Sequence, residues 1–159
     1  MMSEHSTVAA GSPPRLSPAD ISGIRQLIDG MTSSWNAGDG AAYGELFTRN
    51  CDYVTFNGER LRGRDAVARS HQDLFDTHLK GSRLIVENVD VRPINNDVAL
   101  VHCTGNSMLR WQKKAPKSRK SLQTLVATRT EDGWRFAAFH NTRIFKITAF
   151  RAAQMMLGL

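Results

Sequence analysis

The sequence is short of cysteine, of long apolar runs and of any leader-like segment. The two cysteines, Cys51 and Cys103, lie in strand-like segments without metal-ligand spacing, so we predict reduced core thiols in an intracellular, cytoplasmic protein. No apolar run approaches the roughly 20 residues that span a bilayer. The N-terminus lacks the basic and then apolar pattern of a secretory signal. These absences argue against a membrane protein.

Cofactor motifs are absent as well. The sequence holds no dinucleotide fingerprint, no haem motif and no metal triad. A metal site needs several converging ligands, and the pair His102 and His140 lacks a carboxylate at a predictable position. We therefore predict a protein that works without a metal or a nucleotide cofactor.

What the sequence does have is a globular composition with a basic excess. Its 159 residues are 41% hydrophobic and 23% charged, which suits one domain with a real core. The net charge is +6, and six of the 21 lysines and arginines fall within residues 110–120. A solvated loop is the usual meaning of such a segment. Alternatively, it steers an anionic ligand or a carrier protein to a nearby pocket, over the roughly 10 Å that salt screening allows.

Composition divides the chain into three parts. Residues 1–16 are small, polar and rich in proline, so we predict a flexible arm. Residues 17–147 carry periodic patterns and are predicted to form a single domain. Residues 148–159 form an apolar tail, which we expect to cover an edge strand or to dock on a second subunit.

Helical patterns come first. Ser17 is a good N-cap, and Asp20 meets the positive end of the helix dipole. Gly38 ends this helix, and Asp39 caps a second, shorter one. A third helix is predicted between residues 63 and 81. The apolar stripe of the first helix consists of Ile21, Ile24, Leu27, Ile28, Met31 and Trp35.

Strand patterns follow, after one early strand at residues 51–56. Four strands are predicted at residues 83–92, 97–111, 121–129 and 134–146. Helices followed by a run of antiparallel strands indicate an α+β domain, with the helices on one side of the sheet.

The last hairpin gives the most specific prediction. Its Asp132-Gly133 dipeptide readily forms a two-residue turn, and the register that follows places His140 on the same sheet face as Gln123. Neither face of the hairpin is a clean charged surface. We predict that one face packs on helices and that the other lines a cavity.

Several segments together resemble a known family. They are Trp35 to Asp39 (WNAGD), Asp52 to Phe56, Gly63 to Val67 (GRDAV), Asp97 to His102, Gly133 to Phe136 and His140 to Arg143. The layout is similar to the nuclear transport factor 2-like, or SnoaL-like, superfamily over residues 18–146. The last three segments resemble its SgcJ/EcaC subgroup, which includes proteins of actinomycete enediyne antibiotic pathways.

This resemblance implies a cone-shaped fold, with three N-terminal helices packed on a strongly curved, mostly antiparallel sheet, and a homodimer. The superfamily hosts isomerases, cyclases, hydrolases, dehydratases and binding proteins. Its ketosteroid isomerases use a carboxylate base on the first strand. Here that position falls on Thr55 or Phe56, and the position of their helix-borne tyrosine falls on Met31, so we do not expect that reaction.

Two histidines and one aspartate are the candidate catalytic residues. His102 and His140 each interrupt an apolar strand face, where loss of water favours the neutral imidazole. A neutral imidazole acts as a general base or donates to a ligand oxygen; the alternative is a core histidine bonded to a backbone carbonyl. Asp52 is a candidate acid or base, with a solvated aspartate as its alternative.

Amide and aromatic side chains are the candidate substrate-binding residues. We expect Gln123 and Asn141 to orient a substrate beside His140, and His71 on the third helix to close the mouth of the pocket. The remaining candidates are aromatic residues that would stack on a flat ligand, although such residues are core more often: Trp35, Tyr53, Phe56 and Trp111.

These observations predict a pocket protein of enediyne or polyketide biosynthesis that binds a hydrophobic small molecule. The favoured hypothesis is a metal-free polyketide-modifying enzyme, of the cyclase, isomerase or oxygenase kind, that uses histidine acid–base or hydrogen-bonding chemistry. The alternative is a binding protein that sequesters or carries a hydrophobic natural product. The least favoured is a nucleic-acid or acidic-partner role for the basic loop, through Lys113, Lys114, Lys117, Arg119 and Lys120.

Overall fold

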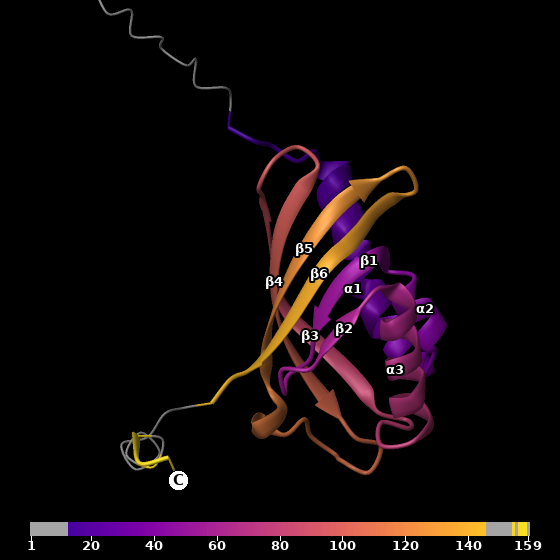
Figure 1. Cartoon of the computed structure of the whole chain (residues 1–159), viewed down its shortest axis with the longest axis vertical. Coiled ribbons are helices and arrows are strands. Elements are labelled where there is room, and N and C mark those ends of the chain that lie inside the picture. The colour runs from indigo at the N-terminus through magenta and orange to yellow at the C-terminus, as the bar shows by residue number, and fades with distance from the viewer. Residues whose placement is uncertain (1–12, 146–153, 155, 159) are drawn as a thin grey trace, which may run out of the picture.

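The computed structural model describes residues 13–145, 154 and 156–158 (Figure 1). The flexible arm and the apolar tail expected from the sequence lie largely outside these residues and stay predictions. Between residues 13 and 145 the elements are α1 (Pro18–Ala37), α2 (Gly40–Gly44), β1 (Phe47–Val54), β2 (Arg60–Arg62), α3 (Arg64–Asp76), β3 (Arg83–Pro93), β4 (Val98–Met108), the 3-10 helix η1 (Lys117–Arg119), β5 (Ser121–Thr130) and β6 (Gly133–Arg143).

The strands of this region form one sheet in the order β2-β1-β6-β5-β4-β3. Within it β1 runs parallel to β6, and the other neighbours are antiparallel. The sheet is strongly curved and does not close, and α1, α2 and α3 all lie on one side of it (Figure 1). The predicted α+β class, with N-terminal helices on a curved and mostly antiparallel sheet, is confirmed.

Helix α1 begins where the sequence predicts. The backbone N–H of Asp20 donates to Ser17 Oγ (3.1 Å), and the backbone N–H of Ser17 donates to Asp20 Oδ2 (3.0 Å). Asp20 Oδ1 also accepts from Arg129 (2.8 Å) and from the indole of Trp134 (3.2 Å). The hydrogen bond from Arg129 is the main reason that the pKa of Asp20 lies below its usual range. The cap therefore also anchors α1 to the hairpin of β5 and β6.

Two glycines of α2, Gly40 and Gly44, allow this helix to pack closely against α3. A Cβ at Gly40 would lie 2.6 Å from the carbonyl oxygen of Ala68, and a Cβ at Gly44 would lie 2.8 Å from Ala68 Cβ. Both separations are too short for real Cβ contacts, so only glycine lets α2 lie directly on α3. This approach stacks the ring of Tyr43 on that of His71, with centroids 4.1 Å apart.

The core lies between the concave face of the sheet and the helices. Phe47, at the start of β1, is fully buried and packs against the rings of Tyr53, Phe136 and Phe139. The cysteines of β1 and β4 are buried free thiols, as predicted. None of the helices in the described part of the chain is both long and apolar enough to cross a membrane.

A β-bulge in β6 decides which side chains face the helices. Ala127 pairs with Phe136, but the preceding residue of β5, Val126, pairs with Ala138. Ala137 is therefore an extra residue in β6, and it reverses the alternation of inward and outward side chains along that strand.

The predicted hairpin register is wrong because of this bulge and of a shifted turn. Thr130 pairs with Gly133, so the turn residues are Glu131-Asp132 and Gly133 follows them with a φ of 98°. Beyond the bulge Gln123 pairs with Asn141. These two amides thus face the helices together. The next pair along the two strands, Thr124 and His140, faces outward.

Candidate functional site

A cavity of about 860 Å³ lies between the concave face of the sheet and the helices. Side chains of all three helices, of η1 and of all six strands contribute to its wall. The helices and the cavity therefore share one face of the sheet, and the prediction that they occupy opposite faces is wrong. The volume suits a small organic molecule.

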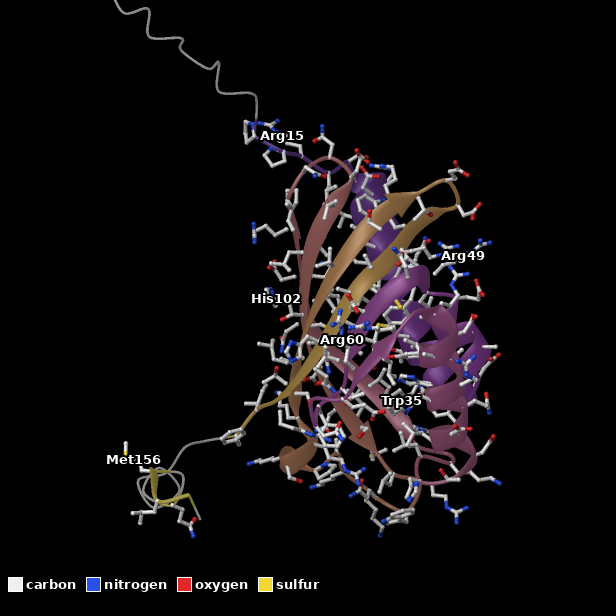
Figure 2. The ribbon with its side chains drawn as sticks, in the orientation of Figure 1. Arg15, Trp35, Arg49, Arg60, His102 and Met156 are labelled. Carbon is white, nitrogen blue, oxygen red and sulfur yellow. The ribbon has the colours of Figure 1, made fainter. Side chains whose placement is uncertain are left out.

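Six residues expected to bind substrate line this cavity: Trp35, Tyr53, Phe56, His71, Gln123 and Asn141. Trp35 lies between the sheet and the helices (Figure 2). Its indole N–H donates to Ser82 Oγ (2.9 Å), and its ring meets that of Phe75 edge-on at 5.3 Å. These contacts hold the indole in one orientation at the cavity wall.

A chain of hydrogen bonds joins two tyrosines and a histidine in the buried part of the wall. The hydroxyls of Tyr43 and Tyr53 are 3.2 Å apart, and the Tyr53 hydroxyl is 3.3 Å from His71 Nε2. His71 Nδ1 lies 2.8 Å from the carbonyl oxygen of Val67. Because a carbonyl only accepts, Nδ1 carries the proton of the neutral ring, and Nε2 is the acceptor for Tyr53.

Burial keeps this chain uncharged at neutral pH. Desolvation lowers the pKa of His71 to about 4 and raises the pKa of both Tyr43 and Tyr53. Burial also raises the pKa of the Cys103 thiol to about 11, so the thiolate needed for nucleophilic attack is not formed at pH 7. The buried part of the wall therefore offers neutral hydrogen-bond donors and acceptors, and the carboxylates of the wall, Glu59 and Asp73, are exposed.

Gln123 and Asn141 form an amide pair on the sheet side. Gln123 Nε2 donates to Asn141 Oδ1 (3.4 Å), and the Cys103 thiol donates to Gln123 Oε1 (3.5 Å). Gly105 on β4 makes room for the amide, since a Cβ there would lie 2.5 Å from Gln123 Nε2. The pair adds two polar groups to a wall that also carries aromatic rings and aliphatic side chains.

Two arginines stand where the cavity opens. Arg119, the last residue of η1, and Arg143, the last residue of β6, both line it. Arg143 Nη1 donates to the carbonyl oxygen of Arg119 and to Ser121 Oγ. Its guanidinium carbon lies 4.2 Å from the centre of the Phe56 ring, a cation–π contact. Phe56 is 55% exposed, so this cluster borders solvent.

The sequence that builds this site matches a family model. Residues 24–142, which run from α1 into β6 and include nearly the whole cavity wall, match the SnoaL-like domain. The chain belongs to the SnoaL-like domain family. This NTF2-like fold is one that binds and modifies small molecules.

Solved structures similar to this SnoaL-like domain share its fold. A domain of unknown function with a cystatin-like fold from Nostoc punctiforme is 37% identical, with a TM-score of 0.77 over 89% of this chain and 85% of that one. An NTF2-like protein from Novosphingobium aromaticivorans is 24% identical, with a TM-score of 0.69 over 84% and 88%. A protein from Streptomyces avermitilis, provisionally named a dehydratase, is 18% identical, with a TM-score of 0.68 over 82% and 100%. No curated protein matches the chain.

The two candidate catalytic histidines of this SnoaL-like domain lie outside its cavity. His140 pairs with Thr124, and Thr124 pairs with His102, so the three form a row on the outer face of the sheet. Figure 2 shows His102 on the side away from the helices. The bulge turns His140 outward, and His102 points opposite to its neighbour Cys103, which lines the cavity. The prediction that both imidazoles face the cavity is wrong.

Asp52 and Trp111 also lie away from the cavity wall. Asp52 forms an ion pair with Arg60 (2.7 Å) and is about half exposed, because it faces the opposite side of β1 from Tyr53. Trp111 is 68% exposed in the loop that follows β4. The expectation that Asp52 and Trp111 face this cavity is therefore wrong, and their roles stay predictions.

Several wall residues were not predicted from the sequence, chiefly Tyr43, Asn106 and Arg143. A period of two does place Arg143 on the same face as Asn141, but only once the bulge fixes that face. Nothing in the sequence marks Asn106, whose buried Oδ1 has no hydrogen-bond partner among the described residues. Tyr43 faces the cavity only because α2 lies against α3.

No group of three or more histidine, cysteine, aspartate or glutamate side chains in the described part of the chain could hold a metal ion. The exposed lysines Lys113 and Lys114 of the basic loop do not reach the cavity; Arg119 does. Independence from cofactors stays a prediction.

Proposed function

We propose that this domain binds an apolar small molecule in its cavity, as a cofactor-independent pocket protein of natural-product biosynthesis. The observation that carries the proposal is a cavity of about 860 Å³ whose wall combines buried rings with neutral hydrogen-bonding groups. Such walls hold organic ligands by apolar contact and orient them through a few polar groups. The residues proposed to bind the ligand are Trp35, Tyr43, Tyr53, Phe56, His71, Gln123 and Asn141.

The kind of pathway rests on the resemblance to the SgcJ/EcaC subgroup. The segments Asp97 to His102 and His140 to Arg143 carry that resemblance. It supports an enediyne or other polyketide-derived intermediate as the ligand. A flat, unsaturated body of this kind suits the exposed face of Phe56 and the fixed indole of Trp35.

Binding without turnover is the function that the site supports best. The tyrosines of the wall are protonated at pH 7, burial lowers the pKa of His71 to about 4 and so makes its imidazole a weak base, and the histidines expected to do acid–base chemistry face outward. An enzyme is the second candidate, favoured by the fixed tautomer of His71. A ligand that displaces the Tyr53 hydroxyl would meet an acceptor nitrogen in an apolar site, which is the setting of a general base.

Trp35→Ala should weaken binding of the neutral dye N-phenyl-1-naphthylamine about tenfold, because the indole face is the largest fixed aromatic surface of the wall. Fluorescence titration of purified protein measures the affinity. The matched controls His102→Ala and His140→Ala lie on the outer face and should bind the dye as the unmodified protein does. If either control weakened binding as much as Trp35→Ala, the cavity would not be the ligand site.

Turnover separates the two candidates. Incubation with polyketide-derived pathway intermediates should leave them chemically unchanged if the protein only binds. If a product forms, Tyr53→Phe and His71→Phe should lower kcat more than they raise KM, since each variant keeps an aromatic ring at the position and removes its polar atoms. Conversion of an intermediate that depends on His71 would replace the binding proposal with the enzyme.

The resemblance also supports a homodimer, which we retain as a proposal. The outer face of the sheet and residues 148–159 are the two candidate interfaces. Sedimentation of a form that lacks residues 148–159 separates them, since a monomer would point to the tail and a dimer to the sheet.

A further inference from the structure

We propose that Arg119 and Arg143 form an oxyanion subsite at the cavity mouth, so that the ligand is an apolar molecule bearing a carboxylate or a similar oxyanion at one end. This inference deepens the proposed function and rests on it. The apolar body of the ligand would lie among the aromatic rings, and its anionic end would meet the two guanidinium groups where the cavity reaches solvent.

The backbone brings these two arginines together. Arg143 pairs with Ser121 at the ends of β6 and β5, and Arg119 lies two residues before Ser121, at the end of η1. One nitrogen of Arg143, Nη1, bonds to the carbonyl oxygen of Arg119 and to Ser121 Oγ. Phe56 supports the flat side of the same guanidinium at 4.2 Å. Arg143 is thus held in place by its surroundings before any ligand arrives.

Neither arginine is neutralised within the described residues. Arg119 Nη1 is buried and has no hydrogen-bond partner there. The hydrogen bonds of the Arg143 guanidinium in this part of the chain all come from Nη1. The ion pairs of the described residues involve other cations: Arg60–Asp52, Arg64–Glu45, Lys120–Glu87, Arg129–Asp20 and Arg129–Asp97.

Placing two like charges side by side opposes folding. The pKa of Arg143 lies below its usual range, mainly because the guanidinium is desolvated and secondly because of the charge of Arg119. Arg129 shows the opposite arrangement, since two carboxylates hold it and raise its pKa. An oxyanion that accepts from both guanidinium groups would remove this repulsion, by the charge-assisted hydrogen bonds that arginine forms best.

The acidic residues of the same wall do not fill this role. Glu59 and Asp73 line the cavity but are exposed, and neither forms an ion pair with Arg119 or Arg143 in the described structure. The lysines of the basic loop are exposed as well, so their charges are screened by salt over roughly 10 Å. The half-buried arginine pair is where the wall would recognise an anion.

Two dyes with one carbon skeleton test the subsite. N-phenyl-1-naphthylamine is neutral, and 8-anilino-1-naphthalenesulfonate adds a sulfonate to it. The full chain should bind the sulfonate at least about tenfold more tightly than the neutral dye. One hydrogen bond to a charged group accounts for about this factor in affinity. Arg119→Gln and Arg143→Gln should each reduce this affinity ratio about tenfold. Lys114→Gln, which removes one exposed charge from the same loop, should keep the ratio of the unmodified protein.

A competition experiment needs no variant and keeps the test decisive if an arginine variant fails to fold. 2-Naphthoate should displace the neutral dye from the unmodified protein at a concentration at least about tenfold lower than 2-naphthalenemethanol does. Equal competition by the two, or an unchanged dye ratio in folded Arg119→Gln and Arg143→Gln, would overturn the oxyanion subsite while the binding cavity stands. Failure of the neutral dye to bind at all would overturn the proposed function itself.

Discussion

Gly40→Ala should lower the free energy of unfolding by about 3 kcal/mol, one of the two largest stability effects that we expect in this domain. The new Cβ would lie 2.6 Å from the carbonyl oxygen of Ala68 and 2.7 Å from the backbone nitrogen of Gln72. Backbone atoms of a helix cannot rotate away, so α2 must move off α3. The same movement would draw Tyr43 from its stacked position on His71. Urea unfolding followed by circular dichroism measures the loss.

Gly30→Ala is the matched control, because it makes the same chemical change in a helix. There the nearest atom to the new Cβ would be Leu46 Cδ2, at 2.7 Å, which is the far end of a flexible side chain. Alanine also favours a helix over glycine by about 1 kcal/mol. We expect the unfolding free energy to stay within about 1 kcal/mol of the unmodified value. Equal tolerance of both substitutions would mean that α2 and α3 are not in direct contact.

Acidification from pH 7 to pH 4 should destabilise the domain by about 3 kcal/mol through His71 alone. Desolvation lowers the pKa of His71 in the folded protein from 6.5 to about 4. As the pH falls from about 6.5 to about 4, His71 binds a proton in the unfolded chain but not in the folded chain. The free energy of unfolding therefore falls with pH between about 6.5 and about 4. Urea unfolding at a series of pH values measures the slope.

His71→Phe isolates this contribution from that of every other titrating group. Phenylalanine keeps a ring against Tyr43 and cannot take up a proton, so the variant should lose about 3 kcal/mol less than the unmodified protein over the same pH range. His140→Asn, on the exposed outer face, should retain the full dependence. A His71→Phe variant with the unmodified slope would show that the imidazole is protonated, and so hydrated, in the folded cavity.

The position of the cavity residues depends on one alanine. If β6 were a regular strand, with no bulge at Ala137, strand alternation would place His140 beside Phe136 on the inner face, as the sequence pattern predicts. With it, Phe139 and Asn141 face inward and His140 faces out. Nothing in the sequence marks this bulge, because its two residues, Ala137 and Ala138, are both alanines.

The sequence by itself determined the order and type of the elements, the cap of α1 and the α+β class. These are set by local causes: a side chain next to a free backbone N–H, an apolar period of 3.6 or 2, and a glycine where a helix stops. It also pointed to the amides and rings of the wall, since Gln123, Asn141, Trp35 and Tyr53 do line the cavity.

Only the tertiary structure decided which face of the sheet each strand turns to the helices. That choice excluded His102 and His140, and it brought Tyr43 to His71 and Arg119 to Arg143. The physical reason is that strand alternation has a period of two, so a single inserted residue exchanges inside and outside for all that follows. The contacts that form the cavity join residues far apart in the chain, and packing alone brings them together.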